Sequence, residues 1–334
     1  MATIKDIAQI AGVSLATVSR VVNNGPKVGD ATRKRVKRVM QELGYRPNAN
    51  ARALVTQRSQ SLGIVLPELS DPFFATMAHG IETIARKNNS QILISTGSIK
   101  KETELKAIET LLEHRCDAMV VHSKALDDET LINFANTVPG FVLINRYIPQ
   151  ISHRCIWLDN ISGGKTMAKH MLKQGHTKFA VVSSQYDIDD PSNRLAGIKS
   201  ELEKHNIFLD DTMIELSTPD QQGGEIAMQN LLAKGADFTA VLAYNDAMAS
   251  GAMTMLQDHN IDVPNEVSII GYDDVLLAKY CRPKLTTLRY PIEMMAMKAT
   301  ELALAYRAGE TPQQGSTFKY APTIVKRESV TRKN

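Results

Sequence analysis

Side chains that could bind a polyol recur at five places in the chain, each directly after a short run of apolar residues. Asp and Asn can accept and donate hydrogen bonds to neighbouring hydroxyl groups, Arg can bridge two hydroxyls, and Phe rings stack on the apolar face of a sugar. A single Asp at a strand end is commonplace as a helix cap, but five such sets together favour one binding cleft. The sets are Asp71 with Phe73, Asn145 with Arg146, Asp159 with Asn160, Asn245 with Asp246, and Asp273 with Asp274.

The apolar runs before these side chains have the length and composition of β-strands, and amphipathic helical patterns separate most of them. This alternation predicts an α/β body built from doubly wound parallel sheets with helices on both faces. Because ligands of such sheets bind beyond the carboxyl ends of the strands, we expect the five polar sets to converge. The number of strands suggests two units, with a first break near Asn160. The expected strands are 62–66, 91–95, 118–122, 141–145, 155–159, 179–183, 212–216, 240–244 and 268–272.

The N-terminal part of the chain, which we call the head, has the pattern of three short helices instead. Thr3 is expected to cap a helix over 4–11, and Ser14 a second helix over 15–22. A third amphipathic pattern runs from about 30 to 43. Two short helices joined by a tight turn and braced by a third predict an all-α helix-turn-helix.

The second helix of the head is the candidate for reading DNA. Its outward side chains are mostly small, which lets a helix enter the major groove, and Arg20 can pair with guanine. The alternative is a small helical bundle with an incidental polar face. The outward residues are Leu15, Ala16, Thr17, Ser19 and Arg20. Side chains that could bond to phosphates are those of Thr3, Ser14, Ser19 and Asn23.

The charge of the chain is unevenly distributed. Residues 1–60 hold eleven basic and three acidic side chains, a net charge of +8, which leaves −5 for the remainder of a chain whose total is +3. A basic head on an acidic body favours a polyanion as the partner of the head alone. A solvated helix face is the ordinary alternative for a basic run such as 33–38.

Length and composition exclude several other classes of protein. A chain of 334 residues is long enough for two or three domains with ample cores. No apolar run reaches the roughly 20 residues that a membrane span needs, and the N-terminus lacks the pattern of a signal peptide. The cysteines, Cys116, Cys155 and Cys281, are too few and scattered for a disulfide framework. These features favour a cytoplasmic protein.

Three stretches in and after the head, 3–14, 17–24 and 44–54, resemble the lactose/galactose repressor family of bacterial transcription regulators. The likeness extends over essentially the whole chain. It implies a DNA-binding head over 1–46 and a hinge helix over 47–59 that folds only on operator DNA.

The hinge has helix-forming residues but no core of its own, and so short a helix does not hold in water. In repressors of this family two hinge helices meet on the DNA, and a Leu wedges into a base step of the minor groove. The resemblance makes Leu54 this wedge and adds Asn48 and Ala51 to the residues that contact DNA. The alternative is that Leu54 packs against the body.

The body, residues 60–330, resembles periplasmic sugar-binding proteins. This resemblance implies a first lobe over about 60–160 plus 291–318 and a second over about 161–290 plus 319–330. Several relatives carry an amide side chain where this chain has Tyr290, so the role of that position stays open. The implied effector-binding residues are Asp71, Phe73, Phe74, Asn145, Arg146, Arg194, Asn245, Asp273 and Tyr290.

Within the family, the galactose-responsive repressors are the most similar. The resemblance therefore implies a cytoplasmic repressor of sugar-utilisation genes that leaves its operator when it binds a monosaccharide, with D-galactose as the expected effector. The alternatives are an isorepressor, or a family member that senses another sugar or a purine-like effector. Little chain follows the expected last strand, 323–330, and no heptad run is present, so we expect a homodimer.

Two other classes remain as alternatives. A sugar-binding transport protein would need an export signal, and the basic head argues against it. A sugar-processing enzyme would need a reactive acid, base or nucleophile, which nothing in the sequence marks. GlyGlyLysThr at 163–166 lacks the first Gly of a phosphate loop, and the two HisArgCys triplets, at 114–116 and 153–155, lack further metal ligands. We expect no cofactor, metal or catalytic residue.

Overall fold

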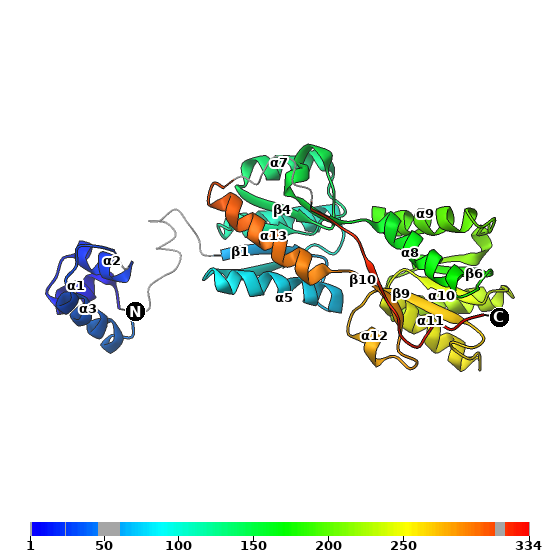
Figure 1. Ribbon diagram of the computed structural model, residues 1–334. Coiled ribbons are helices and arrows are strands. Elements are labelled where there is room, and N and C mark those ends of the chain that lie inside the picture. Colours follow the sequence, from blue (N-terminus) through cyan, green and yellow to red (C-terminus); the bar gives the residue numbers. More distant parts are fainter. Residues whose placement is uncertain (1, 24, 46–60, 311–317, 334) are drawn as a thin grey trace. The chain divides into compact units, whose positions relative to one another are not determined.

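The computed structural model describes residues 2–23, 25–45, 61–310 and 318–333. The chain forms two compact units, one of residues Met1–Ser61, which contains the head, and one of residues Leu62–Asn334, which is the body (Figure 1). None of the described helices is long and apolar enough to cross a membrane.

The head consists of α1 (Ile4–Ala11), α2 (Leu15–Val22) and α3 (Asp30–Glu42). Both expected caps are present. The Oγ1 of Thr3 accepts from the Asp6 N–H while the Asp6 carboxylate accepts from the Thr3 N–H, and Ser14 accepts from the Thr17 N–H. Gly12 ends α1 with a φ of 61°, a left-handed conformation that glycine adopts at little cost.

Apolar side chains from all three helices make the small hydrophobic core of the head. Ile7 of α1, Val18 of α2 and Val36 of α3 are completely buried. Most of the basic side chains of α3 point into solvent. The predicted helix-turn-helix is therefore confirmed as a fold, and its charges lie outside its core.

Lobe 1 of the body is a six-stranded sheet with helices on both faces. Its strands are β1 (Ser61–Leu66), β2 (Gln91–Thr96), β3 (Ala118–Val121), β4 (Gly140–Ile144), β5 (Cys155–Leu158) and β11 (Phe318–Tyr320). Its helices are α5 (Pro72–Lys87), α6 (Lys101–Glu113), α7 (Asp128–Thr137), the 3₁₀ turn Pro149–Arg154 and α13 (Ile292–Arg307). The strand order is β11-β5-β4-β3-β1-β2.

Lobe 2 has the same arrangement. Its strands are β6 (Phe179–Ser184), β7 (Ile214–Ser217), β8 (Ala240–Ala243), β9 (Ser268–Asp273), β10 (Thr286–Arg289) and β12 (Thr323–Val325), in the order β12-β10-β9-β8-β6-β7. Its helices are α8 (Asn160–Lys173), α9 (Asp189–Glu203), the 3₁₀ turn Asp211–Met213, α10 (Gln221–Ala233), α11 (Asp246–Asp258) and α12 (Leu277–Tyr280). All of its ladders are parallel except the pairing of β12 with β10.

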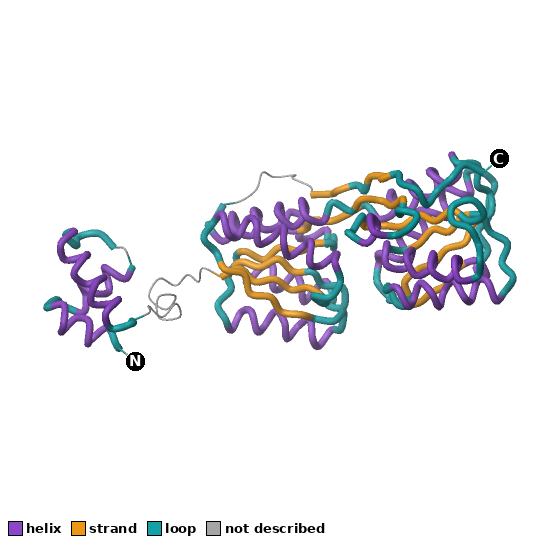
Figure 2. The backbone as a smooth tube through the Cα atoms, turned by 90° about the horizontal axis from the view of Figure 1, so that it is seen from below, coloured by secondary structure: helices purple, strands orange, loops and turns teal. Residues whose placement is uncertain are grey.

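Each sheet lies between two layers of helices, as Figure 2 shows. In lobe 1, α5 and α13 cover one face of the sheet, and α6 and α7 cover the other. Alternate residues of each strand contact opposite helix layers. In lobe 2, α8 and α9 cover one face and α10 and α11 the other. One apolar cluster, which includes Leu158, Leu288 and Tyr290, continues from lobe 1 into lobe 2.

The predicted α/β fold with two sheets and a helical head is confirmed. All nine expected strands are present as β1 to β9, although β7 begins two residues later than expected. The expected last strand, 323–330, is paired only over Thr323–Val325. The sheet of lobe 1 also extends beyond the expected boundary at 318, because β11 pairs with β5 as far as Tyr320.

Candidate ligand cavity and nucleic-acid interface

A cavity of ≈ 230 Å³ opens between the two lobes, at the carboxyl ends of strands from both sheets. The fold brings together eight of the nine effector residues expected from the sequence, and the ninth, Arg146, lies elsewhere. The eight that line the cavity are Asp71, Phe73, Phe74, Asn145, Arg194, Asn245, Asp273 and Tyr290. Other lining residues include Glu68, His122, Tyr186, Asp190, Asp220 and Tyr244.

Arg194 is the central cation of this cavity, although only 5% of the residue is exposed. Its Nε donates to Asn160 Oδ1 at 2.9 Å and its Nη1 to the Tyr244 carbonyl at 2.6 Å. Its guanidinium carbon lies 3.6 Å from the centre of the Tyr272 ring and 4.5 Å from that of Tyr244. These contacts hold the guanidinium rigidly, so it can present a fixed donor edge to a ligand.

Asp273 lies beside Arg194, with Oδ1 4.0 Å from its Nη2. Burial raises the pKa of Asp273 well above its usual value, although the positive charge of Arg194 opposes that shift. Asp273 also has a backbone φ of 108°, a conformation that residues other than glycine rarely adopt. Strained backbone of this kind concentrates at functional sites, which supports a role for Asp273 in binding.

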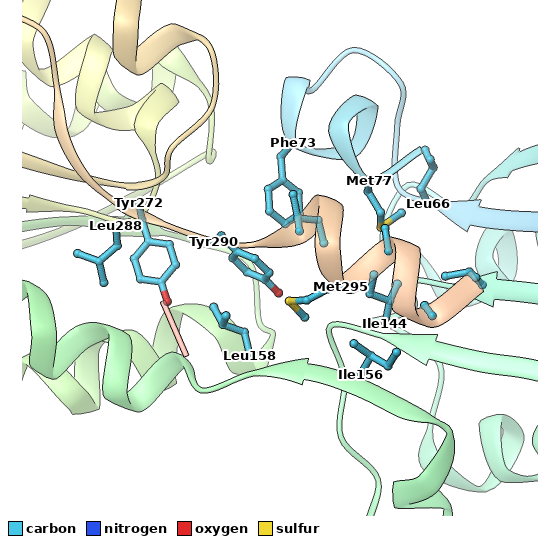
Figure 3. Close-up of a cluster of buried hydrophobic side chains, with 14 of the residues drawn as sticks. Leu66, Phe73, Met77, Ile144, Ile156, Leu158, Tyr272, Leu288, Tyr290 and Met295 are labelled. Atoms are coloured by element: carbon cyan, nitrogen blue, oxygen red, sulfur yellow. The ribbon is translucent and has the colours of Figure 1, made fainter. Parts of the chain in front are cut away.

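Aromatic rings form one wall of the cavity. The rings of Phe73 and Tyr290 meet edge to face with centroids 4.9 Å apart, and Tyr272 lies beyond Tyr290 at 6.4 Å (Figure 3). The Tyr290 hydroxyl donates to Asn145 Oδ1. Phe74 stands against His122, with ring centroids 5.1 Å apart. This wall could cover the apolar face of a sugar ring.

Asp71 and Asn245 have two roles in the structure. The Asp71 carboxylate accepts from the Phe73 N–H and caps α5, while Asn245 Oδ1 accepts from the Met248 N–H and caps α11. Both side chains nevertheless line the cavity. Helix capping and cavity lining are thus compatible for these strand-end residues.

Asp190, at the start of α9, was not singled out from the sequence. Its Oδ1 accepts from Lys124 Nζ and Asn160 Nδ2, both at 2.9 Å, and its Oδ2 accepts from Asn145 Nδ2 at 3.2 Å. Burial disfavours its charged form, but the positive charges of Lys124 and Arg194 outweigh that effect and lower its pKa. Asp190 therefore contributes a fully partnered carboxylate to the wall.

Arg146, the ninth expected effector residue, lies outside the cavity wall. Its guanidinium donates to the carbonyls of Ser123 and Leu126 and to the Asp128 carboxylate, at 3.3, 2.8 and 2.7 Å respectively. It does not line the cavity. The chain leaves β4 through Asn145, whose φ of 60° is left-handed, and Asn145 lines the cavity while Arg146 bonds to the neighbouring loop.

Other polar residues at the strand ends also have structural partners instead of places in the cavity wall. Asp246 accepts from Thr287 Oγ1 and the Val275 N–H, and burial raises its pKa to about 7. Asp274 forms ion pairs with Arg289 and Arg327. Asp159 pairs with Lys319. Asn145, Asn245 and Asp273 each represent their polar pair in the cavity wall, whereas neither Asp159 nor Asn160 lines it, so the fifth expected set does not reach the cavity.

Several lining residues that were not expected from the sequence also follow a strand, as the expected ones do. His122 directly follows β3, Tyr186 follows β6, and Asp220 follows β7. Applying this strand-end rule to every expected strand would have found them. His122 is buried, and burial lowers its pKa to about 3, so the imidazole is neutral. Its Nδ1 has no hydrogen-bond partner, although the ring is part of the cavity wall.

The head places its expected DNA contacts along the start and outer face of α2. Leu15, Ala16 and Arg20 are exposed, whereas Thr17 and Ser19 are half-buried. Thr3 and Ser14 act as helix caps, which leaves them at the surface of the head. Asn23 donates to Ser19 Oγ at 3.4 Å. The hinge residues Asn48, Ala51 and Leu54 lie outside the described residues.

Groups of three or more potential metal ligands are absent from the described residues. The cysteines of the two HisArgCys triplets, Cys116 and Cys155, are buried, and burial raises the pKa of each thiol to about 11. They therefore pack as small apolar side chains.

Comparison with known proteins gives consistent results for both units. The profile of "Bacterial regulatory proteins, lacI family" matches residues 3–48, and that of "Periplasmic binding protein-like domain" matches residues 168–330. The HTH-type transcriptional regulator GalR of Salmonella typhimurium is 47% identical over 330 residues, which cover 99% of this chain and 96% of that protein. The regulator GalS of the same organism is 45% identical, with 99% and 97% covered.

Solved structures show the same fold. A transcriptional regulator of the lacI family from Burkhoderia phymatum superposes with a TM-score of 0.76 at 29% identity, covering 82% of this chain and all of that one. The lac repressor dimer bound to operator and an anti-inducer superposes with a TM-score of 0.87 at 24% identity, covering 99% of both chains.

Proposed function

We propose that this chain, which belongs to the lacI family of bacterial regulatory proteins, has D-galactose as its effector. As a member of that family, the chain is a DNA-binding transcription regulator and not an enzyme. The likeness to GalR and GalS over nearly the whole chain favours a galactose regulator over a ribose regulator, since the Haemophilus influenzae ribose operon repressor is only 31% identical.

The observation that carries this proposal is the chemistry of the cavity. One guanidinium, two carboxamides and several carboxyls face an aromatic wall, a set that suits a ring with several hydroxyls. Acidic side chains outnumber basic ones: Glu68, Asp71, Asp190, Asp220 and Asp273 stand against Arg194. Arg194, the basic side chain of this wall, already donates to Asn160 and to the Tyr244 carbonyl, so a phosphate group would find few free donors. The proposed effector is therefore the free monosaccharide.

The head supplies the proposed contacts with operator DNA. The exposed Arg20 would read a guanine, and Thr3, Ser14, Ser19 and Asn23 would bond to phosphates, as the position of α2 at the surface of the head allows. The hinge residues Asn48, Ala51 and Leu54 would complete the interface in the minor groove. The protein acts as a cytoplasmic homodimer, with two heads on a pseudo-palindromic operator.

The proposed mechanism is a population shift in the body. D-galactose favours the arrangement of the lobes in which both sides of the cavity bond to it, and that arrangement separates the two hinge segments. Operator affinity then falls by the coupling free energy, which is typically about 1–3 kcal/mol.

Two titrations test the proposal. Calorimetry with D-galactose, D-glucose and D-galactose 1-phosphate should give heat of binding with D-galactose and none with the phosphate ester. Fluorescence anisotropy of a labelled operator should then show release of the DNA as D-galactose is added. Failure of every free monosaccharide to bind, or tighter DNA binding with the sugar, would contradict it.

A further inference from the structure

Lys124, in the loop after β3, reaches from lobe 1 to a carboxylate of lobe 2. Its Nζ lies 2.9 Å from Asp190 Oδ1, and the side chains are 5% and 7% exposed. The same Nζ donates to the Asn145 carbonyl of lobe 1 at 2.6 Å. The Lys124–Asp190 pair is far more buried than the ion pairs on the surface of either lobe, such as that of Lys101 with Asp127.

The loop that carries Lys124 is fixed on two sides. The buried Glu104 carboxylate accepts from Ser123 Oγ and from the N–H groups of Lys124, Ala125 and Leu126, at 2.5 to 3.1 Å. Arg146 binds the carbonyls of the same loop from the other side. The backbone of Lys124 is therefore already held in place, so that only its side chain has to be ordered when it meets Asp190.

Asp190 depends on this cation because burial disfavours its negative charge, and Arg194 acts on its pKa through charge alone whereas Lys124 also donates a hydrogen bond. Asp190 is 5% exposed, and both of its oxygens are bonded only to side chains. Two of its three bonding partners, Lys124 and Asn145, belong to lobe 1 and are lost when the lobes move apart. Breaking a buried ion pair is costly when one charge stays behind without its partner.

We propose that Lys124 is a positioning residue that holds the cleft closed through Asp190 and thereby sets the affinity for the effector, an inference that rests on the cavity being the effector site. Without the ammonium group, the closed arrangement contains a buried carboxylate that has lost the cation bonded to it, whereas an open arrangement hydrates it. The population of the closed form falls, and the apparent affinity of a ligand that needs closure falls in proportion.

The direct test is the distance between the lobes without any sugar. Spin labels attached at Glu109→Cys of α6 and Glu203→Cys of α9, both exposed positions, report this distance when labelled protein is diluted with unlabelled protein. Lys124→Met should lengthen or broaden the distance distribution. Lys101→Met, which removes an exposed lobe 1 cation paired with Asp127, should leave it unchanged. Identical distributions for Lys124→Met and the unaltered protein would overturn the proposal.

A double-mutant cycle on D-galactose binding separates this role from simple damage to the fold. Lys124→Met should raise the dissociation constant by at least about tenfold, and Lys101→Met should not change it. In the Asp190→Asn background, Lys124→Met should add less than about threefold, because the charge that it neutralises is gone. Equal effects of Lys124→Met in both backgrounds would reject the pairing as the cause.

Two further outcomes keep the test decisive. If Lys124→Met does not fold by circular dichroism, Asp190→Asn removes the same pair from the other lobe and should lengthen the same distance. If the unaltered protein binds no D-galactose but the distance still changes in Lys124→Met, the role of Lys124 in closure stands and only the proposed effector is rejected.

Discussion

The head and the body of this protein display their candidate binding residues in opposite surroundings. Arg20 and Leu15 of the head lie exposed on α2, over a hydrophobic core of only a few side chains. Arg194 and Asp273 of the body line a cavity, where their side chains are only 7% and 13% exposed. The head thus presents side chains that remain hydrated until a partner covers them. The body presents side chains that the fold already shields from most of the water.

This difference matches the two kinds of partner. A polyanion is attracted by many exposed cations at long range, and the attraction is screened by salt. A neutral polyol carries no charge to attract, so its recognition depends on hydrogen bonds that are strong only where water is excluded. An acidic surface on the head would instead repel the polyanion.

The largest effect is expected from removing the head. A body that lacks residues 1–59 should lose operator binding completely and keep its affinity for D-galactose, because the cavity is built entirely from residues of the body. For the full-length protein, the logarithm of operator affinity should fall steeply with the logarithm of salt concentration. Operator binding by the truncated body, measured by fluorescence anisotropy, would contradict the separation of roles.

A smaller but still large effect is expected from Asp273→Ala. The substitution removes the carboxyl beside Arg194 and leaves the sugar hydroxyls that would bond to it without a buried partner, which costs about 1–3 kcal/mol. Calorimetry should therefore show roughly a tenfold or greater loss of D-galactose affinity. Operator affinity without sugar should be unchanged, and induction should require more sugar. Release of the operator at the normal sugar concentration would place the effector site elsewhere.

Leu54→Ala should act only on the DNA side of the comparison. If this side chain is buried only against operator DNA, each copy contributes about 1.5–3 kcal/mol, and specific binding should weaken roughly tenfold or more. D-galactose affinity and the melting temperature of the free protein should not change. A lower melting temperature without DNA would mean that Leu54 packs on the body.

The smallest effect is expected from Arg146→Ala. This side chain binds the loop of Ser123 and Leu126 and does not line the cavity, so its loss acts on the sugar only through the position of Lys124. D-galactose affinity should fall by a few-fold, about 1 kcal/mol or less, clearly less than for Asp273→Ala. A loss in calorimetry equal to that of Asp273→Ala would mean that Arg146 touches the sugar after all.

Much of the fold could be predicted because its signals are local. Thr3 and Ser14 cap their helices wherever the helices lie, and the apolar runs of β1 to β9 are short and bounded by polar residues. β10 and β11 were not among the nine expected strands. They are short segments that pair at or near the edges of the two sheets, so their structure depends on the neighbouring strands more than on their own sequence.

The candidate cavity was predicted in part for the same reason. The rule that ligands bind beyond strand ends depends only on chain direction, and it correctly brought Asp71, Asn245 and Asp273 to one cavity. It could not decide which member of a polar pair faces inward. Asn145 lines the cavity and Arg146 does not, because the path of the chain after β4 turns them to opposite sides.

The sequence by itself therefore determined the helical head, the two α/β lobes and the kinds of side chain at each strand end, since these follow from periodicity, capping and charge within short windows. Only the tertiary structure decided that Lys124 meets Asp190 and that Tyr290 bonds to Asn145. Those partners are 66 and 145 residues apart along the chain. Contacts at such separations depend on how the two lobes pack, which no local pattern encodes.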